Sequence, residues 1–356
     1  MLLAISVTQK FKAQLLDTDS ASLKKRHLFT GAPVIFYTPE TRFGFGATGV
    51  YLFNFKSDSL FARKSTLSLG FAFTQNKQTI FNLPYNLFIK NRAYHLYGEV
   101  SYYKFFYNFY GVGNGMPENF VERYGVEYPR LRISALKKIK KHVFIGPRYA
   151  FDKFRLFDLD STGVLATKSI RGSEGALVSG FGIVHIFDSR DDIFYPKKGW
   201  WYEFVFYHDD PVTGSTYRYN RVTFDVSRYF SFKENVIALN AYTLYSDADL
   251  PFFQMAQLGG QKRMRGFYEG RYRDNNAIVF QAEYRRYILW WLGIAVFGNV
   301  GQVAHRYDSF NAQYWRYTYG SGIRLKISRA QKLNLRIDFA IGNKQLLPYF
   351  TIGEAF

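Results

Sequence analysis

The stretch Gly259-Gly-Gln-Lys-Arg-Met-Arg-Gly-Phe-Tyr-Glu-Gly-Arg-Tyr-Arg-Asp274 combines four glycines with five arginines and lysines. It interrupts long runs of residues in which apolar and polar side chains alternate. Such alternation, with a period of two residues, is typical of β-strands. A loop on a soluble sheet rarely needs this density of glycine and positive charge, so the fold has to be inferred from the strands on both sides.

Composition narrows the class of β protein. The chain of 356 residues contains 37 Phe and 29 Tyr, and aromatic residues make up 20% of it. No run approaches the roughly 18 apolar residues that a membrane helix requires. A transmembrane β-barrel combines these properties, because residues facing lipid alternate with residues facing the lumen. We therefore predict an all-β transmembrane barrel, and the alternative is a large soluble β protein.

The net charge of +19 is also typical of proteins that bind nucleic acid. Here, however, Lys and Arg are spread over turns and alternate strand positions and do not form one stripe. A polar lumen and basic turns facing anionic lipid explain the charge equally well. We expect outer-membrane lipid and lipopolysaccharide as partners, and no nucleic acid. The absence of cysteine suits an oxidising periplasm.

Regular alternation begins at Gly31 and predicts sixteen antiparallel strands. Their expected bounds are 31–38, 42–55, 64–74, 78–89, 92–105, 122–139, 143–157, 176–188, 200–207, 217–230, 235–245, 277–289, 292–303, 314–327, 332–342 and 347–356. An even number of strands is typical of bacterial outer-membrane barrels. We assign residues 31–356 to the barrel and residues 1–30 to a short periplasmic segment, either a tail or a small helix.

The lengths of the connections indicate which end of the barrel faces outward. If the turn at Pro39-Glu40 is the first external loop, every odd-to-even connection is external. The long connections 106–120, 159–175 and 250–276 then fall on the external side. The short turns 90–92, 137–142, 189–199 and 329–331 fall on the other side, as in bacterial barrels with tight periplasmic turns and long external loops.

Several motifs, taken in order, resemble one known family. Met264-Arg265-Gly266-Phe267 resembles the (Val/Ile/Met)-Arg-Gly-(Phe/Tyr) motif of the BamA/TamA outer-membrane barrel superfamily, also called the bacterial surface antigen family. Phe297-Gly-Asn299-Val-Gly301 is similar to the Phe-x-Asp-x-Gly element of the family's thirteenth strand. Phe356 resembles the C-terminal aromatic residue of its barrel-targeting signal. The resemblance covers essentially all of residues 31–356.

A fourth motif lies after the predicted eighth strand. Asp188-Ser-Arg190-Asp191, followed by Pro196 and Gly199, resembles the family's Asp-x-Arg-Asp…Pro-x-x-Gly turn. Asp188, Asp191 and Asp192 could also be read as a metal cluster. We favour the structural interpretation, in which these carboxylates cap the turn and pair with Arg190.

The resemblance implies a long sixth external loop that folds into the barrel, where its arginine contacts carboxylates on the inner wall. Glu283 lies on the polar face of the twelfth strand and is the best partner for Arg265. On the thirteenth strand Asn299 replaces the family's Asp, and an amide carries no charge. We expect the interaction of Arg265 to be weaker for this reason, or to rest on Glu283 and Asp338. The alternative is that Arg265 is a solvated loop residue.

No pattern of catalytic residues accompanies these motifs. The six histidines lack paired metal-ligand spacing, and neither a Gly-x-Ser-x-Gly elbow nor a phosphate-binding Gly-Lys-Ser/Thr loop occurs. We predict no catalytic residue, no cofactor and no metal site, and hence a protein that is not an enzyme.

The resemblance implies a role in inserting outer-membrane proteins or moving polypeptides across the outer membrane of a Gram-negative bacterium. Family members capture clients with amino-terminal POTRA domains by strand addition. Only about 30 residues precede the barrel here, so we expect a POTRA-less member or an isolated barrel domain. Client outer-membrane or secreted proteins, a second copy of the chain and accessory subunits are candidate partners.

The leading hypothesis uses a weak seam between the first strand, 31–38, and the last, 347–356. Pro33 and Pro348 favour such a seam, because proline cannot donate a hydrogen bond to a sheet. Two alternatives stay open. One is a passive narrow pore that favours anions, and the other is a structural subunit of a larger outer-membrane assembly.

Overall fold

The computed structural model describes residues 26–58, 64–328 and 333–356. Most of the predicted periplasmic segment 1–30 lies outside them. The strands are β1 His27–Thr38, β2 Arg42–Phe53, β3 Ser65–Thr74, β4 Thr79–Ile89, β5 Tyr94–Phe109, β6 Glu122–Lys140, β7 Val143–Phe157, β8 Ala176–Asp188, β9 Gly199–Asp209, β10 Tyr219–Phe232, β11 Asn235–Ser246, β12 Ala256–Leu258, β13 Tyr272–Asp274, β14 Asn276–Tyr287, β15 Leu292–Ala304, β16 Arg316–Ser328, β17 Leu333–Gly342 and β18 Gln345–Ile352. Short 3₁₀ helices cover Pro211–Thr213, Tyr307–Ser309 and Ala312–Tyr314.

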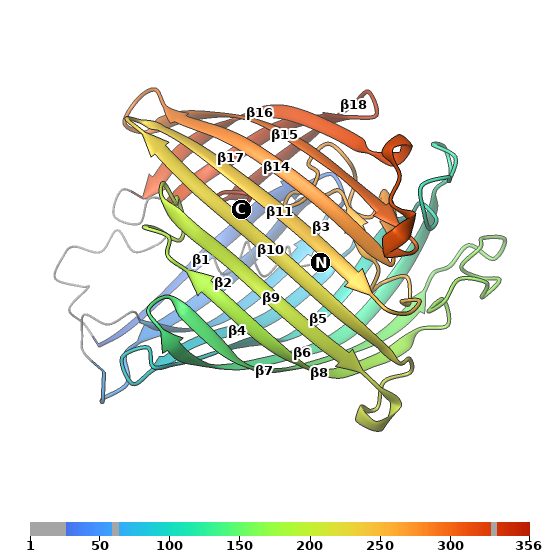
Figure 1. The fold of residues 1–356 in the computed structure, drawn as a ribbon, viewed down its shortest axis with the longest axis horizontal. Coiled ribbons are helices and arrows are strands. Elements are labelled where there is room, and N and C mark those ends of the chain that lie inside the picture. The colour runs from blue at the N-terminus through green and yellow to red at the C-terminus, as the bar shows by residue number, and fades with distance from the viewer. Residues whose placement is uncertain (1–25, 59–63, 329–332) are drawn as a thin grey trace.

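Sixteen of these strands form one closed antiparallel barrel, in the order β1-β18-β17-β16-β15-β14-β11-β10-β9-β8-β7-β6-β5-β4-β3-β2. This confirms the predicted sixteen-stranded antiparallel barrel. The remaining two, β12 and β13, pair only with each other, in the connection between β11 and β14. Long connections lie at the right of the barrel in Figure 1 and short turns at the left. Among the described residues, no helix is long and apolar enough to cross a membrane.

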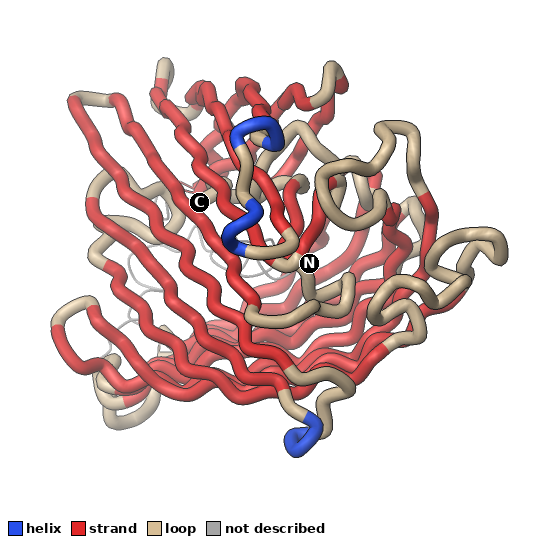
Figure 2. Tube along the Cα trace, turned by 45° about the vertical axis from the view of Figure 1, so that its right-hand side comes forward, coloured by secondary structure: helices blue, strands red, loops and turns tan. Residues whose placement is uncertain are grey.

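Each strand presents an apolar outer face and a mostly polar inner face. On β3, Leu69, Phe71 and Phe73 point outward and are 50%, 44% and 54% exposed. On β14, Phe280 is 48% exposed, whereas its inward neighbour Gln281 is 3% exposed. An exposed apolar band around a polar interior is stable only when hydrocarbon surrounds the barrel. Figure 2 shows the strands forming the wall, with the longer loops gathered at one end.

Three strand ends differ from the predicted ones by four residues, and the other ends differ by two residues at most. β1 begins at His27 rather than at Gly31. β5 continues to Phe109, so the loop predicted to begin at Phe106 begins at Tyr110. In this region aromatic side chains occupy both faces of the strand, which hides the alternation. β18 ends at Ile352 and not at Phe356.

The closure between β1 and β18 is short. Among the described residues, one pair joins the two strands, Tyr37 opposite Phe350, whose rings meet edge to face at 5.8 Å. On its other side β1 pairs with β2 along its whole length. Beyond Ile352 the chain leaves the sheet, because Gly353 adopts a φ of 80°. The edge of β1 from His27 to Phe36 therefore has no strand partner in the described part of the chain.

Candidate functional site

The connection 247–275, between β11 and β14, lies against the inner wall of the barrel. Its apolar side chains Leu250, Leu258 and Met264 are fully buried. They belong to a cluster with inward-facing wall residues, among them Val279 of β14 and Val303 of β15. The small β12–β13 sheet holds the two ends of this connection together, from Ala256 opposite Asp274 to Leu258 opposite Tyr272.

Arg265 lies near the middle of this connection and is fully buried. Its Nη2 lies 2.5 Å from Oε2 of Glu283 on β14, and its Nη1 lies 2.5 Å from Oδ2 of Asp338 on β17. The guanidinium carbon is 3.5 Å from the centre of the Phe297 ring on β15. One planar fork thus contacts three strands of the wall, which a Lys side chain could not do with the same geometry.

A second guanidinium, that of Arg324 on β16, holds the same carboxylates. Its Nη1 lies 2.6 Å from Asp338 Oδ1, and its Nη2 lies 2.9 Å from Glu283 Oε1. Its Nε lies 2.8 Å from Oε2 of Glu354, in the segment that follows β18. Arg285 Nε lies 2.7 Å from Glu283 Oε1. Both oxygens of Glu283 and both oxygens of Asp338 therefore accept hydrogen bonds from guanidinium groups.

We call this set the lumen charge network; its members are Arg265, Arg285, Arg324, Arg336, Glu283, Asp338 and Glu354. Each is at most 3% exposed. Taking charges out of water costs several kcal/mol per ion, and removing one partner of a buried pair costs about 3–5 kcal/mol because a bare charge remains. The network holds four guanidinium groups and three carboxylates, so removing any one of the carboxylates leaves buried positive charge without a partner.

Gly266 and Phe267 fix the position of the loop next to this network. Gly266 has a φ of 111°, and a Cβ there would lie 2.9 Å from the carbonyl oxygen of Ile341 on β17. The Gly266 N–H donates to the Tyr349 hydroxyl (3.1 Å), which itself donates to the carbonyl of Phe267 (3.2 Å). Only glycine allows this backbone to approach β17 so closely.

The residues of the Phe297-Gly-Asn299-Val-Gly301 motif on β15 make different contacts. Phe297 carries the guanidinium of Arg265 on its ring. Gly301 leaves room for the loop, since a Cβ there would lie 3.3 Å from the sulfur of Met264. Asn299 donates from Nδ2 to the Thr318 hydroxyl at 2.8 Å. The two carboxylates contacted by Arg265 are those of Glu283 and Asp338, not a group at position 299.

The turn between β8 and β9 is built from carboxylate caps. Asp188 accepts from Nε and Nη2 of Arg190 at 2.8 and 2.9 Å. Asp191 Oδ1 accepts from the backbone N–H groups of Lys197 and Lys198. Pro196 is buried, and Gly199 has a φ of 107° where a Cβ would lie 2.3 Å from the Ser189 carbonyl oxygen.

Asp192 Oδ1 in the same turn accepts from the backbone N–H groups of Phe194 and Tyr195. Carboxylates used in this way stabilise the turn instead of converging on a cation. Among the residues that the structure describes, no group of three or more His, Cys, Asp or Glu could hold a metal ion.

Some residues of the site carried too little signal in the sequence. Arg324 lies on the predicted polar face of its strand, but alternation cannot say which carboxylate it meets. Tyr349 lies at an inward-facing position of β18, but alternation likewise cannot say which residue it contacts. Glu354 was expected within a strand and lies beyond its end. Asp225 on β10, which binds Arg263 Nη2 at 3.1 Å, had no motif to mark it.

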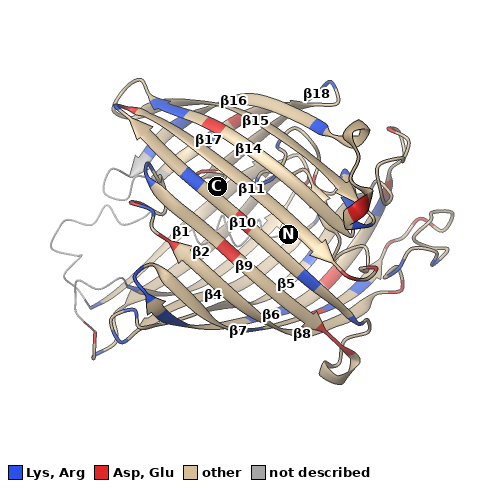
Figure 3. Ribbon diagram, viewed as in Figure 1, with Lys and Arg blue, Asp and Glu red and all other residues tan. Residues whose placement is uncertain are grey.

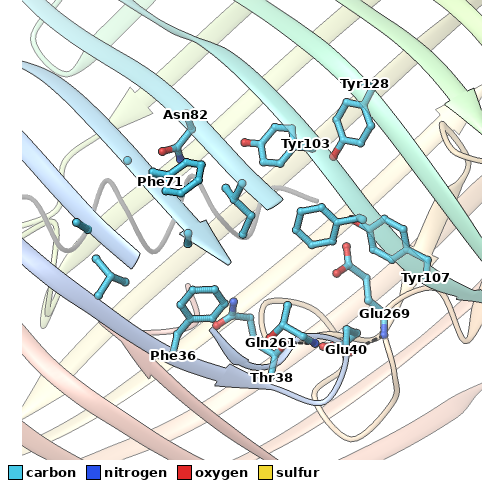
Figure 4. A pocket seen from close by; sticks show the side chains of 17 residues that line it. Phe36, Thr38, Glu40, Phe71, Asn82, Tyr103, Tyr107, Tyr128, Gln261 and Glu269 are labelled. Carbon is cyan, nitrogen blue, oxygen red and sulfur yellow. Dashed lines mark hydrogen bonds between the residues drawn. The ribbon is translucent and has the colours of Figure 1, made fainter. Parts of the chain in front are cut away.

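The turn between β1 and β2 also contacts the loop. Glu40 Oε1 accepts from the backbone N–H of Glu269 at 2.9 Å. Figure 4 shows both carboxylates at one cavity, which Phe36 and Phe71 line on its apolar side. Burial, and then the nearby charge of Glu269, raise the pKa of Glu40 to about 7.

Replacing Arg265 by alanine should free the loop. The substitution leaves Glu283 and Asp338 without one guanidinium, so we expect chymotrypsin to cleave after Phe267 or Tyr268 at least about ten times faster. The rate of fragment formation measures the effect. Arg306→Ala is the matched control, because Arg306 is an exposed arginine that pairs only with Asp308 among the described residues. Equal cleavage of Arg265→Ala and wild type would argue against a loop held by Arg265.

The contact of Glu40 with the loop should depend on pH. A folded pKa above the unfolded value means that the neutral carboxyl is favoured in the fold, so its stabilisation is complete below about pH 4.5 and is lost as the pH rises through about 7. Cleavage within 260–274 should therefore become faster above about pH 7 in the wild type and not in Glu40→Gln. An identical pH profile in the two proteins would contradict this role of Glu40.

Comparisons of the sequence and of the fold with known proteins also identify an outer-membrane barrel. Residues 40–356 match the model of the Omp85 superfamily domain. The fold is similar to BamA from Haemophilus ducreyi lacking POTRA domains 1–3, with a TM-score of 0.62, 14% identity and coverage of 92% of this chain and 70% of that chain. No curated protein sequence matches the chain significantly.

Two further structures are similar. CdiB from Acinetobacter baumannii has a TM-score of 0.59 and 13% identity, covering 92% of this chain and 60% of that one. CdiB from Escherichia coli has a TM-score of 0.61 and 12% identity, covering 91% and 62%. The chain thus spans less than two thirds of either CdiB chain. The resemblance inferred from the sequence motifs is confirmed: the chain belongs to the Omp85 superfamily and is an integral outer-membrane β-barrel protein.

Proposed function

We propose that this barrel assists the insertion or translocation of polypeptides at the outer membrane by opening the seam between β1 and β18. The observation that carries the proposal is the single residue pair, Tyr37 opposite Phe350, that joins these strands in the described part of the chain. Every other neighbouring pair in the barrel is held by a longer ladder. β5 and β6, for example, pair from Tyr94 opposite Lys137 to Phe109 opposite Glu122.

The energetics of a bare edge support this use of the seam. A backbone N–H or C=O without a partner costs several kcal/mol in hydrocarbon, so strands that span a membrane normally pair on both sides. In the closed barrel, the unpaired backbone groups along the edge of β1 from His27 to Phe36 carry this free-energy cost. A client strand added to this edge would satisfy these groups, as in other cases of strand addition.

The loop links the lumen to both sides of the seam. On one side, Gly266 and Phe267 bond to the hydroxyl of Tyr349 on β18. On the other, Glu269 donates to Glu40 in the turn that ends β1. Movement of the loop would therefore change the support of both edge strands. The superfamily match and the similarity to BamA and CdiB support a client that is an outer-membrane or secreted protein.

A second candidate is a passive pore. Beside the loop lies a lumen cavity of about 480 Å³, in whose lining seven Lys and Arg residues, among them Arg132 and Arg221, outnumber the five carboxylates, among them Glu99 and Glu203. Positive charge along a water-filled path would favour anions. In this case conduction would not require the seam to open.

A disulfide across the seam separates the two candidates. Tyr37→Cys with Phe350→Cys places the only two cysteines of the chain at directly paired positions. When this bond forms, the protein in liposomes should lose its acceleration of the folding of an unfolded barrel client, and reduction should restore it. Heat-dependent gel migration of the client measures its folding.

The matched control is Phe224→Cys with Thr243→Cys, which links β10 and β11 inside a continuous ladder. Oxidation of this variant should leave client folding unchanged. Full activity of the oxidised seam variant would contradict the proposal. Conductance without any effect on client folding would favour the pore. Activity that requires co-purifying proteins would favour a structural subunit.

A further inference from the structure

The exposed charges differ between the two ends of the barrel. At the end of the short turns, which is the periplasmic end, ten described Lys and Arg residues are exposed, namely Lys56, Lys90, Arg92, Lys137, Lys138, Lys140, Lys141, Lys198, Lys233 and Arg286. The exposed carboxylates at this end are those of Asp191 and Glu234. Asp191 is already used as a cap by the backbone of Lys197 and Lys198. The periplasmic rim is therefore strongly basic.

Six of these cations gather at the turn before β5 and at the neighbouring end of β6 with the turn that follows it. We call them the basic rim cluster; they are Lys90, Arg92, Lys137, Lys138, Lys140 and Lys141. The Lys138 N–H donates to the Ala93 carbonyl at 2.8 Å, which joins the two segments. Figure 3 shows blue at the end of β6 and on the turn that leads into β7. The nearby carboxylate of Asp58 is buried and accepts from the N–H of Asn91.

The cluster lacks the ion pairs that neutralise cations at the opposite end. There, Lys168 pairs with Glu174 at 2.9 Å, and Arg306 pairs with Asp308 at 3.0 Å. Among the residues that the structure describes, none of the six cations of the basic rim cluster forms a salt bridge. Six like charges held close together repel one another, and an anionic ligand would relieve this repulsion.

The backbone also holds the first turn in an unfavourable conformation. Lys90, Asn91 and Arg92 have φ values of 52°, 52° and 71°. Side chains other than glycine adopt such values at a cost of roughly 1–2 kcal/mol per residue. This turn nevertheless has Lys90 and Arg92 at positions where glycine would be less strained.

The cluster continues directly into the surface that faces lipid. Tyr94 and Lys137 lie opposite each other on β5 and β6, and Lys90 Nζ is 5.8 Å from the centre of the Tyr94 ring. Tyr94, Ile139 and Ile145 are 39%, 53% and 39% exposed on this outer face. Lysines around an exposed ring at the edge of an apolar band match the boundary between acyl chains and headgroups.

We propose that the basic rim cluster is a binding site for the phosphodiester headgroup of an anionic phospholipid in the periplasmic leaflet. The cations contact the phosphate, and the apolar surface around Tyr94, Ile139 and Ile145 contacts the acyl chains. A soluble acidic partner would use the charges alone and would leave this adjoining apolar surface unused. The site does not include the seam, so the lipid-binding proposal can be tested independently of the proposed insertion activity.

The test measures lipid binding by the whole chain in a neutral detergent. Dye-labelled phosphatidylglycerol is titrated against the wild type, and its anisotropy is read. The variant Lys137→Gln, Lys138→Gln, Lys140→Gln, Lys141→Gln should bind at least about ten times more weakly, since each lysine near an anionic lipid surface contributes to the attraction. Phosphatidylcholine should bind weakly to both proteins, and about 1 M salt should weaken the binding of phosphatidylglycerol.

The matched control removes four lysines from the other half of the barrel, as Lys77→Gln, Lys153→Gln, Lys168→Gln, Lys344→Gln. It has the same net charge as the first variant and should bind like the wild type. Heat-dependent gel migration checks that both variants are folded. Equal loss in both variants would overturn the proposal, because net charge alone would explain it. Equally tight binding of an acidic peptide or of glycerol phosphate would overturn the assignment to lipid.

Discussion

The guanidinium of Arg265, held between the carboxylates of Glu283 and Asp338, is the interaction on which the arrangement of the lumen depends. All three groups are fully buried. Charges in such a place persist only when each has partners with good geometry. Arg324 satisfies this condition by occupying the remaining oxygen of each carboxylate. The loop is thereby attached to the strands β14, β15 and β17 at one point.

The same network reaches the end of the chain and so bears on the closure of the barrel. Glu354 gives its carboxylate to Arg324 and to the side-chain amide of Asn334. To do so, the chain turns inward at Gly353 and leaves the sheet after Ile352. With Tyr37 opposite Phe350, β18 therefore ends before it could pair with the residues of β1 that precede Ile35. In this account the network that holds the loop also keeps the edge of β1 unpaired, which connects the charge balance of the lumen with the proposed use of the seam.

Alternation and motif spacing were sufficient to predict the barrel, its strand number and the inward position of Glu283 and Asp338. These features depend on local periodicity, which a single sequence contains. The ends of β5 and β18 were predicted wrongly. Aromatic residues on both faces hide the end of β5, and the end of β18 is decided by ion pairs with residues far away in the chain. Arg324 and Glu354 were missed as partners for the same reason, since nothing local indicates which charges meet across a lumen.

Asn299 departs from the family pattern, which has Asp at this position. Its amide was expected to weaken the interaction of Arg265 or to transfer it to Glu283 and Asp338. In the structure Asn299 bonds to Thr318, and the guanidinium contacts these two carboxylates. The energetic value of this arrangement rests on the burial of the ions rather than on the number of acids.

The most direct test of the central claim, that the loop held by Arg265 obstructs the path through the lumen, is the conductance of the purified protein in a planar bilayer. The wild type is compared with a variant that lacks residues 260–274. The account predicts that the wild type is nearly closed and that the deletion opens a stable conducting path. A wild type that already conducts steadily, and that does not respond to the deletion, would contradict it.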